Sequence, residues 1–196
     1  MMHPDTEIQF ISNEIGYWVV ATKLIPKGSI TWVQDELDQV YTPLQISKMR
    51  EISRQMIDKY SFRNNKGNFV LCWDKSKYVN HSFRSNCLST AYDFEVAIRD
   101  IYPGEELTDD YGYLNVTEAF KPKDEGTSRS TVYPDDLVHF HKEWDTQLAD
   151  AFEYIKGVNQ PLMSLIPHNI QQKLKMILEG REQLDSVLSL YYPDGE

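Results

Sequence analysis

The sequence predicts a mainly β domain that is followed by two helices. Short apolar runs, separated by turn residues, continue to about residue 114. A polar stretch with Pro, Gly, Ser and Thr follows over 115–134, and beyond it the apolar residues recur at helical spacing. We therefore expect a β-rich domain over 1–114 with an inserted helix at about 43–59, a loop over 115–134 and a helical extension over 135–196.

Short strands are expected at several places in the β-rich part. Residues 17–33 predict two strands that are separated by the turn at 26–28, because apolar runs flank a Pro and a Gly. Residues 68–73 are strand-like, and residues 92–99 alternate between apolar and polar side chains, which is typical of a half-buried strand. A short aromatic run at 107–113 closes this part of the chain.

The inserted helix has a recognisable start. Thr42 can cap it, Pro43 suits the first helical position, and Gln45 occupies the return position of a capping box. Apolar side chains then recur at helical spacing to about residue 59, namely Met49, Ile52 and Met56.

Two apolar stripes predict the C-terminal helices. The first stripe comprises Leu137, Phe140, Trp144, Leu148, Ala151 and Ile155. After a break at 157–161, the second comprises Ile170, Leu174, Ile177, Leu178, Leu184, Val187 and Leu188. Gly180 falls within the second stripe and is expected to weaken that helix by about 1 kcal/mol relative to alanine.

Composition limits the classes of partner. The chain carries a formal net charge of −10, which argues against a nucleic-acid partner, since phosphate binding needs clustered Lys and Arg. An acidic surface suits a cationic partner such as a lysine-rich protein segment, although the charge could equally serve solubility alone. Hydrophobic residues make up 41% of the chain and charged residues 26%, as in ordinary globular proteins.

Cysteine content and targeting signals bear on location. Cys72 and Cys87 are the two cysteines, too few for a disulfide framework or a four-cysteine zinc site. The N-terminus lacks the pattern of a secretory signal, and no window approaches 18 consecutive apolar residues, so we expect no membrane span. A reducing cytoplasm is the expected location.

Two segments carry side chains with possible chemistry, Asn80-His81-Ser82 and residues 104–113. Alone, neither decides anything, because a His beside an Asn is usually structural and the Glu pair after Gly104 usually lies in a solvated turn. His139 and His141 are two residues apart and would point about 200° apart on a helix, which argues against a shared metal site.

Taken together, three motifs resemble the signature of SET-domain protein lysine methyltransferases. They are residues 16–28 (GYWVVATKLIPKG), residues 77–82 (KYVNHS) and residues 104–113 (GEELTDDYGY). The resemblance covers roughly residues 8–114. It implies a β-clip-like SET fold of several small sheets, in which the last motif passes through a loop near Asn80 and His81 to form a pseudoknot.

The resemblance also implies a cofactor, S-adenosylmethionine. Backbone groups of Gly16, Tyr17 and Trp18 would hold its methionine end, with Trp18 standing where the family pattern has a second glycine. Asn80 would bind the cofactor through its side-chain amide, and His81 mainly through backbone groups.

By the same resemblance, Tyr111 would be the catalytic tyrosine, and Tyr78 and Tyr113 would line a narrow channel for the substrate lysine. The attacking amine must be neutral, which neutral pH opposes by about 4 kcal/mol for a free lysine. A dry aromatic channel and the positive sulfur of the cofactor both lower the pKa of the amine, so no strong general base is required.

Phe83 follows Asn-His-Ser where many SET enzymes have a zinc-binding cysteine, and residues 115–134 supply no cysteine either. A tetrahedral thiolate site cannot form, so we expect no metal. We hypothesise that the 115–134 loop packs over the cofactor pocket with Phe120 and Tyr133 as apolar anchors, and that Phe120 contacts the cofactor. The alternative is a disordered linker to the helices.

The expected activity is methyl transfer to a lysine of a basic protein substrate, for which histones are the first choice. An acidic rim for such a peptide could come from Asp35, Glu36, Asp38, Asp109 and Asp110, or these could be ordinary solvated residues. One alternative function is an inactive SET-fold module that binds a basic partner; another is that the helices serve assembly. The sequence leaves open the substrate, the degree of methylation, whether the target is the organism's own or a host protein, and the oligomeric state.

Overall fold

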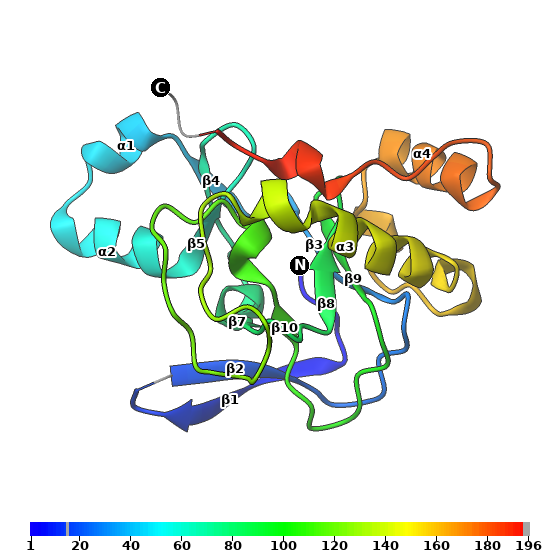
Figure 1. The fold of residues 1–196 in the computed structure, drawn as a ribbon, viewed down its shortest axis with the longest axis horizontal. Helices are drawn as coiled ribbons and strands as arrows, with labels where there is room; N and C mark the ends of the chain where they lie inside the picture. Colours follow the sequence, from blue (N-terminus) through cyan, green and yellow to red (C-terminus); the bar gives the residue numbers. More distant parts are fainter. Residues whose placement is uncertain (15, 194–196) are drawn as a thin grey trace.

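The computed structural model, which describes residues 1–14 and 16–193, contains four small sheets. Two antiparallel strands, β1 (Thr6–Ser12) and β2 (Gly16–Ala21), form the first sheet, which lies at the lower edge in Figure 1. The second has the order β3-β9-β8, with β3 (Ile30–Val33), β8 (Cys87–Ser89) and β9 (Phe94–Ala97). The third has the order β4-β6-β5, with β4 (Gln39–Tyr41), β5 (Ser61–Arg63) and β6 (Phe69–Leu71). A parallel pair, β7 (Asn80–His81) and β10 (Thr108–Asp109), forms the fourth.

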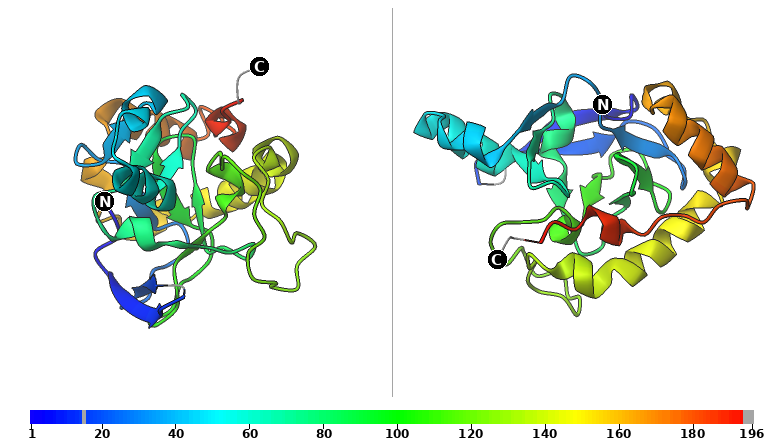
Figure 2. Two further views of the ribbon diagram at one scale, coloured as in Figure 1. Left: turned by 90° about the vertical axis from the view of Figure 1, so that its left-hand side faces the viewer. Right: turned by 90° about the horizontal axis from the view of Figure 1, so that it is seen from above.

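The helices lie around these sheets. They are α1 (Pro43–Ser47), α2 (Glu51–Tyr60), α3 (Asp136–Phe152) and α4 (His168–Leu178), with 3-10 turns η1 (Lys75–Tyr78), η2 (Tyr111–Tyr113), η3 (Ile155–Gly157), η4 (Met163–Leu165) and η5 (Val187–Leu190). In Figure 2, α1 and α2 project at one end of the molecule, and α4 lies at the other. In the described part of the chain, none of the helices combines the length and the apolar character that a bilayer crossing needs. The predicted class, small β sheets with a two-helix extension, is confirmed.

The inserted helix differs from the prediction in one respect. The capping box is present, because the Thr42 side chain accepts from the backbone N–H of Gln45 while the Gln45 side chain accepts from that of Thr42. The helix nevertheless ends at Ser47, and a second one begins after Arg50, whose φ of −65° and ψ of 150° are extended. Since α1 buries none of its residues, no packing opposes this break.

The second C-terminal helix is also shorter than predicted. α4 ends at Leu178, and Gly180 adopts a left-handed φ of +70°, which is where glycine commonly terminates a helix. The stripe continues beyond the helix: Leu184 precedes η5, and Val187 and Leu188 lie within it. Gly180 therefore ends the helix rather than weakening it.

The helical extension shares its core with the β-rich part. Phe94 of β9 stacks on Phe152 of α3 with ring centroids 6.4 Å apart, and Val187 of η5 belongs to the same buried cluster. Leu148 and Leu174 bring α3 and α4 into this cluster. Because the apolar stripes of both helices pack into this cluster, they present little apolar surface for assembly.

The parallel pairing of β7 with β10 positions the site. Asn80 pairs with Thr108 and His81 pairs with Asp109, so the two motifs that the sequence singled out lie side by side. A further backbone hydrogen bond, from the N–H of Ser82 to the carbonyl of Asp109, spans 2.9 Å and extends the pairing.

Candidate active site

Tyr111 lies where the two motifs meet. The Asp110 side chain accepts from the backbone N–H of Gly112 and starts the short turn η2. The Tyr111 hydroxyl donates to the carbonyl of Val79 at 2.6 Å, and its backbone N–H donates to Nδ1 of His81 at 3.1 Å. Burial raises the pKa of the Tyr111 hydroxyl, so it stays a neutral donor.

His81 is a neutral imidazole in an aromatic environment. Because Nδ1 accepts a hydrogen bond, the ring proton belongs on Nε2, which is buried and has no partner among the described residues. Burial lowers the pKa of His81 to about 4. The rings of Phe83, Tyr111 and Phe120 surround it at centroid distances of 4.5, 5.4 and 5.8 Å.

The His81 pKa makes folding sensitive to acid. The unfolded chain protonates this imidazole near pH 6.5 and the folded chain near pH 4, so stability is lost as the pH falls through that interval. We expect His81→Gln to remove up to about 3 kcal/mol of this loss between pH 7 and pH 4, measured by urea unfolding. The matched control is His139→Gln on the exposed side of α3; an unchanged pH profile in His81→Gln would contradict the assignment.

A cavity of about 370 Å³ opens beside Tyr111. Its aromatic walls are Trp32, Tyr60, Phe62, Phe69, Tyr111 and Phe120. The carboxyl side chains that line it include Glu95 and Asp109. Glu95 lies in the strand predicted at 92–99, and nothing in the sequence distinguishes it as a site residue. An aromatic cavity next to a buried tyrosine hydroxyl has the form expected of a channel for an alkyl amine.

The other predicted channel residues lie elsewhere. Tyr113 is only 2% exposed and packs edge-to-face against Trp144 at 5.3 Å, while its hydroxyl accepts from the N–H of Ser89. Tyr113 is therefore not among the residues that line the cavity, because η2 turns it towards the core shared with α3. Tyr78 is not among the residues that line the cavity. Its ring contacts that of Tyr60, which does line it, at 5.6 Å and that of Tyr17 at 5.4 Å.

The predicted cofactor residues from β2 and β7 are neighbours. The Asn80 amide donates to the carbonyl of Tyr17 at 3.2 Å and to Oε1 of Glu106 at 2.8 Å, which connects the two strands. Gly16 has a φ of +93° and no heavy atom within 4 Å of where a Cβ would be, so its backbone borders open space. Trp18 is half-buried, and its Nε1 is buried without a partner among the described residues.

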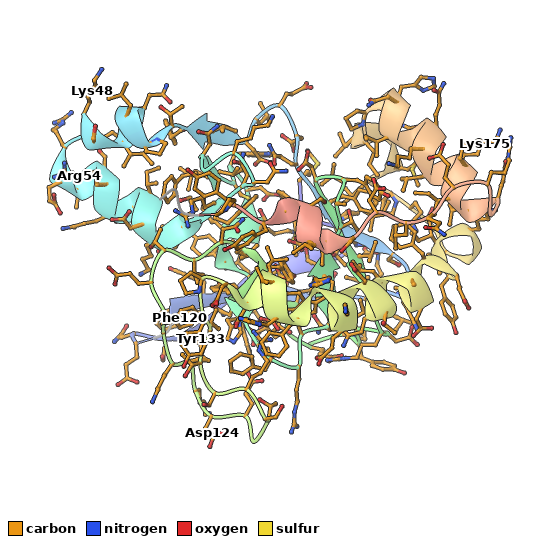
Figure 3. The ribbon with its side chains drawn as sticks, turned by 45° about the horizontal axis from the view of Figure 1, so that its top comes forward. Lys48, Arg54, Phe120, Asp124, Tyr133 and Lys175 are labelled. Carbon is orange, nitrogen blue, oxygen red and sulfur yellow. The ribbon has the colours of Figure 1, made fainter. Side chains whose placement is uncertain are left out.

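The 115–134 loop packs against these motifs (Figure 3). Phe120 contacts the rings of His81 and Tyr111, and its backbone pairs with Val132, which is fully buried. The Glu125 carboxylate accepts from the Ser82 hydroxyl at 3.0 Å and from the N–H of Phe83 at 3.1 Å. These contacts contradict the alternative of a disordered linker.

Tyr133, in contrast, is 50% exposed and is not the second anchor that the sequence predicted. Val132 takes that place, since the pairing with Phe120 directs it inwards and leaves its neighbour outside.

Arg129 is the central cation of the loop. Its guanidinium pairs with Asp110, from the motif at 104–113, and with Asp136 of α3 at 2.6 Å. It also lies 4.7 Å from the ring centre of Phe83 and 4.4 Å from that of Phe140. Phe83, found where a zinc ligand is common, therefore contacts an arginine that joins the loop, the motif and α3. No signal in the sequence distinguishes Arg129 from a surface arginine.

The predicted acidic rim is largely wrong. Asp109 and Asp110 are buried, so they cannot present charge to a peptide at the surface. Asp35 pairs with the N-terminal ammonium at 3.0 Å and accepts from the indole N–H of Trp73. Asp38 is half-buried, and Glu36 remains exposed. Within residues 1–14 and 16–193, no group of three or more His, Cys, Asp or Glu is arranged to hold a metal ion.

The fold and this arrangement of motifs define a SET domain, and residues 16–112 match the family model of the SET domain. Residues 16–112 therefore belong to the SET-domain family, as the resemblance indicated. No curated protein matches the chain significantly.

Two solved structures are similar over about half of the chain. One is a candidate histone methyltransferase of Plasmodium falciparum, at 17% identity over 56% of this chain and 95% of that chain, with a TM-score of 0.42. The other is CpSET8 of Cryptosporidium, at 26% identity over 55% of this chain and 57% of that chain, with a TM-score of 0.40. At these TM-scores neither carries weight in the assignment, which rests on residues 16–112.

Proposed function

We propose that this protein transfers methyl groups from S-adenosylmethionine to a lysine side chain of a protein substrate. The observation that supports this best is the aromatic cavity beside the Tyr111 hydroxyl, in a chain whose residues 16–112 match the SET domain. The negative charge of −10 favours a basic substrate segment, and histones are the first proteins to test. Cys72 and Cys87 are both buried and free, which suits the proposed cytoplasmic location.

The residues present fit the cofactor. S-adenosylmethionine carries hydrogen-bond acceptors on its adenine, ribose and carboxylate. Two of the predicted cofactor residues have a buried donor without a partner among the described residues, Trp18 at Nε1 and His81 at Nε2. The open backbone at Gly16 permits close approach, and the Asn80 amide oxygen accepts no hydrogen bond from a described residue. Phe120, in ring contact with His81, would cover the adenine side.

The chain's own contribution to the chemistry is positioning and desolvation. When bound, S-adenosylmethionine supplies an electrophilic methyl group on a positively charged sulfur. The aromatic walls exclude water and lower the pKa of the substrate amine, which favours its neutral, nucleophilic form. The Tyr111 hydroxyl, held by the carbonyl of Val79, orients the amine at the end of the cavity.

Calorimetric titration with S-adenosylmethionine tests the cofactor assignment without knowledge of the substrate. We expect saturable binding, weakened about 3- to 10-fold in Trp18→Phe, because that variant loses the indole N–H and keeps an aromatic ring. Trp73→Phe is the matched control, since Trp73 is exposed and its indole N–H bonds Asp35. Equal affinities in Trp18→Phe and wild type would remove Trp18 from the site.

Methyl transfer is tested next, with radiolabelled cofactor and histones. Incorporation of label into lysine supports the proposed function. Cofactor binding without transfer to any lysine-rich protein would favour the alternative, an inactive SET-fold module that binds a basic partner. Absence of cofactor binding would contradict the proposal itself.

A further inference from the structure

The aromatic cavity is lined by carboxyl groups that include Glu95 and Asp109, which the proposed mechanism does not use. Glu95 comes from the middle of β9, and Asp109 is the last residue of β10. Asp109 is only 3% exposed, and its Oδ1 has no hydrogen-bond partner among the described residues. Glu95 is half-buried because part of its surface faces the cavity. An unpartnered carboxyl oxygen in the wall of a cavity is available to accept a hydrogen bond from a ligand.

The two carboxyl groups lie close enough to share a proton, because each affects the pKa of the other. Burial raises the pKa of Glu95 to about 7 and raises that of Asp109 well above its ordinary value. The negative charge of Glu95 opposes ionisation of Asp109, so the pair titrates as a unit. Near neutral pH it therefore exchanges between a neutral state and a monoanion.

The surrounding charges do not neutralise the pair. Asp74 and the N-terminal ammonium act on Glu95 from a distance, and Asp110 acts on Asp109. The Tyr111 hydroxyl nearby is neutral. Lys59, Arg63 and Lys77 line other parts of the cavity, as do Asp58 and Glu118. Within the described part of the chain, neither Glu95 nor Asp109 forms an ion pair with a lysine or an arginine.

We propose that Glu95 and Asp109 bind the amino group of the substrate lysine and take up its proton. The aromatic walls accept the alkyl chain and favour a cation, while the carboxyl pair supplies the countercharge at the end of the cavity. This inference rests on the proposed function, because it names the group that prepares the amine for methylation.

The proton transfer is balanced within the site. An N–H bond of the ammonium breaks and an O–H bond forms on the carboxyl pair, which changes from monoanion to neutral while the amine becomes neutral. From a free lysine ammonium, with an ordinary pKa near 10.4, to the carboxyl pair, in which the pKa of Glu95 is about 7, this transfer is uphill by roughly a factor of 10³. In a dry cavity the two neutral groups are favoured over the buried ion pair, because each charge would lose its hydration.

A purely structural role is the competing explanation, in which the shared proton only joins β9 to β10. The two explanations differ in what they predict for ligands. A structural pair has no preference between a cation and a neutral molecule of the same shape, whereas an amine site prefers the cation only when the pair is ionised.

The test is an NMR titration of the whole chain with n-butylammonium and, as the neutral probe, 1-butanol. We expect the affinity for n-butylammonium to rise at least about tenfold from pH 5.5 to pH 8.5, as the pair ionises, and the affinity for 1-butanol to stay constant. Asp109→Asn and Glu95→Gln should each abolish the rise. The matched controls, Asp58→Asn and Glu118→Gln, change exposed carboxyl groups that line the same cavity. They should retain the rise in affinity for n-butylammonium with pH.

Two results would overturn the inference: equal affinity for the two probes at pH 8.5, or an unchanged rise in both Asp109→Asn and Glu95→Gln. Circular dichroism verifies the fold of each variant, and either variant suffices if the other unfolds. The titration needs no cofactor. If this titration gave either of these results while S-adenosylmethionine binding was intact, the proposed role of the carboxyl pair would be refuted and the proposed function would stand.

Discussion

Replacing Arg129 with methionine is expected to lower the free energy of unfolding by about 3–5 kcal/mol. Methionine keeps much of the length of the side chain and removes its charge, so the buried carboxylates of Asp110 and Asp136 lose their common partner. An uncompensated charge in a buried site costs far more than an exposed ion pair contributes. Urea unfolding followed by tryptophan fluorescence measures the change.

Two comparisons make this result specific to the buried cluster. Arg84→Met changes an exposed arginine and should cost less than about 0.5 kcal/mol. Combining Arg129→Met with Asp110→Asn and Asp136→Asn should recover part of the loss, because no buried charge then remains unpaired. A loss below about 1 kcal/mol in Arg129→Met alone would show that the cluster does not hold the loop in place.

Tyr111→Phe is expected to reduce methyl transfer at least about 100-fold in kcat/KM, a loss typical of removing one positioned hydrogen-bond donor from an active site. The ring that packs against His81 and Phe120 remains, so folding should change by only about 1 kcal/mol for the lost bond to Val79. The measurement is the initial rate of label transfer at several substrate concentrations.

Cofactor affinity serves as the internal reference for this variant. Calorimetry should give the same S-adenosylmethionine affinity for Tyr111→Phe and wild type, since the proposed cofactor donors are Trp18 and His81. Tyr133→Phe, at a half-exposed position of the loop, should leave the transfer rate unchanged. Equal rates in Tyr111→Phe and wild type would contradict the catalytic assignment.

Arg129 helps to hold the 115–134 loop, which lacks the zinc-binding cysteines of many SET enzymes. The sequence indicated that a thiolate site could not form, because Phe83 and the 115–134 loop provide no cysteine. In the structure, the loop is instead held by Glu125 on the turn at Ser82 and Phe83 and by Arg129 on Asp110. The loop is thus connected to the motifs by hydrogen bonds and ion pairs, and the Phe120 ring contacts the His81 ring.

Local patterns predicted local features well. The capping box at Thr42 and the stripe of α3 depend on residues a few positions apart, so the sequence contains the whole interaction. The break at Arg50 and the end of α4 at Gly180 were missed, since a continuing apolar pattern does not show whether packing supports it.

The sequence by itself determined the SET motifs, the short strands, the two C-terminal helices and the absence of cysteine ligands from the 115–134 loop. Only the tertiary structure decided which neighbours of Tyr111 face the cavity. Asp109 lines the cavity, Tyr113 enters the core and Asp110 pairs with Arg129, although all lie within a few residues of one another. The physical reason is that a two-residue strand followed by a 3-10 turn is too short to show a periodic pattern of apolar and polar residues. Pairing with β7 and packing against α3 therefore determine where each side chain points.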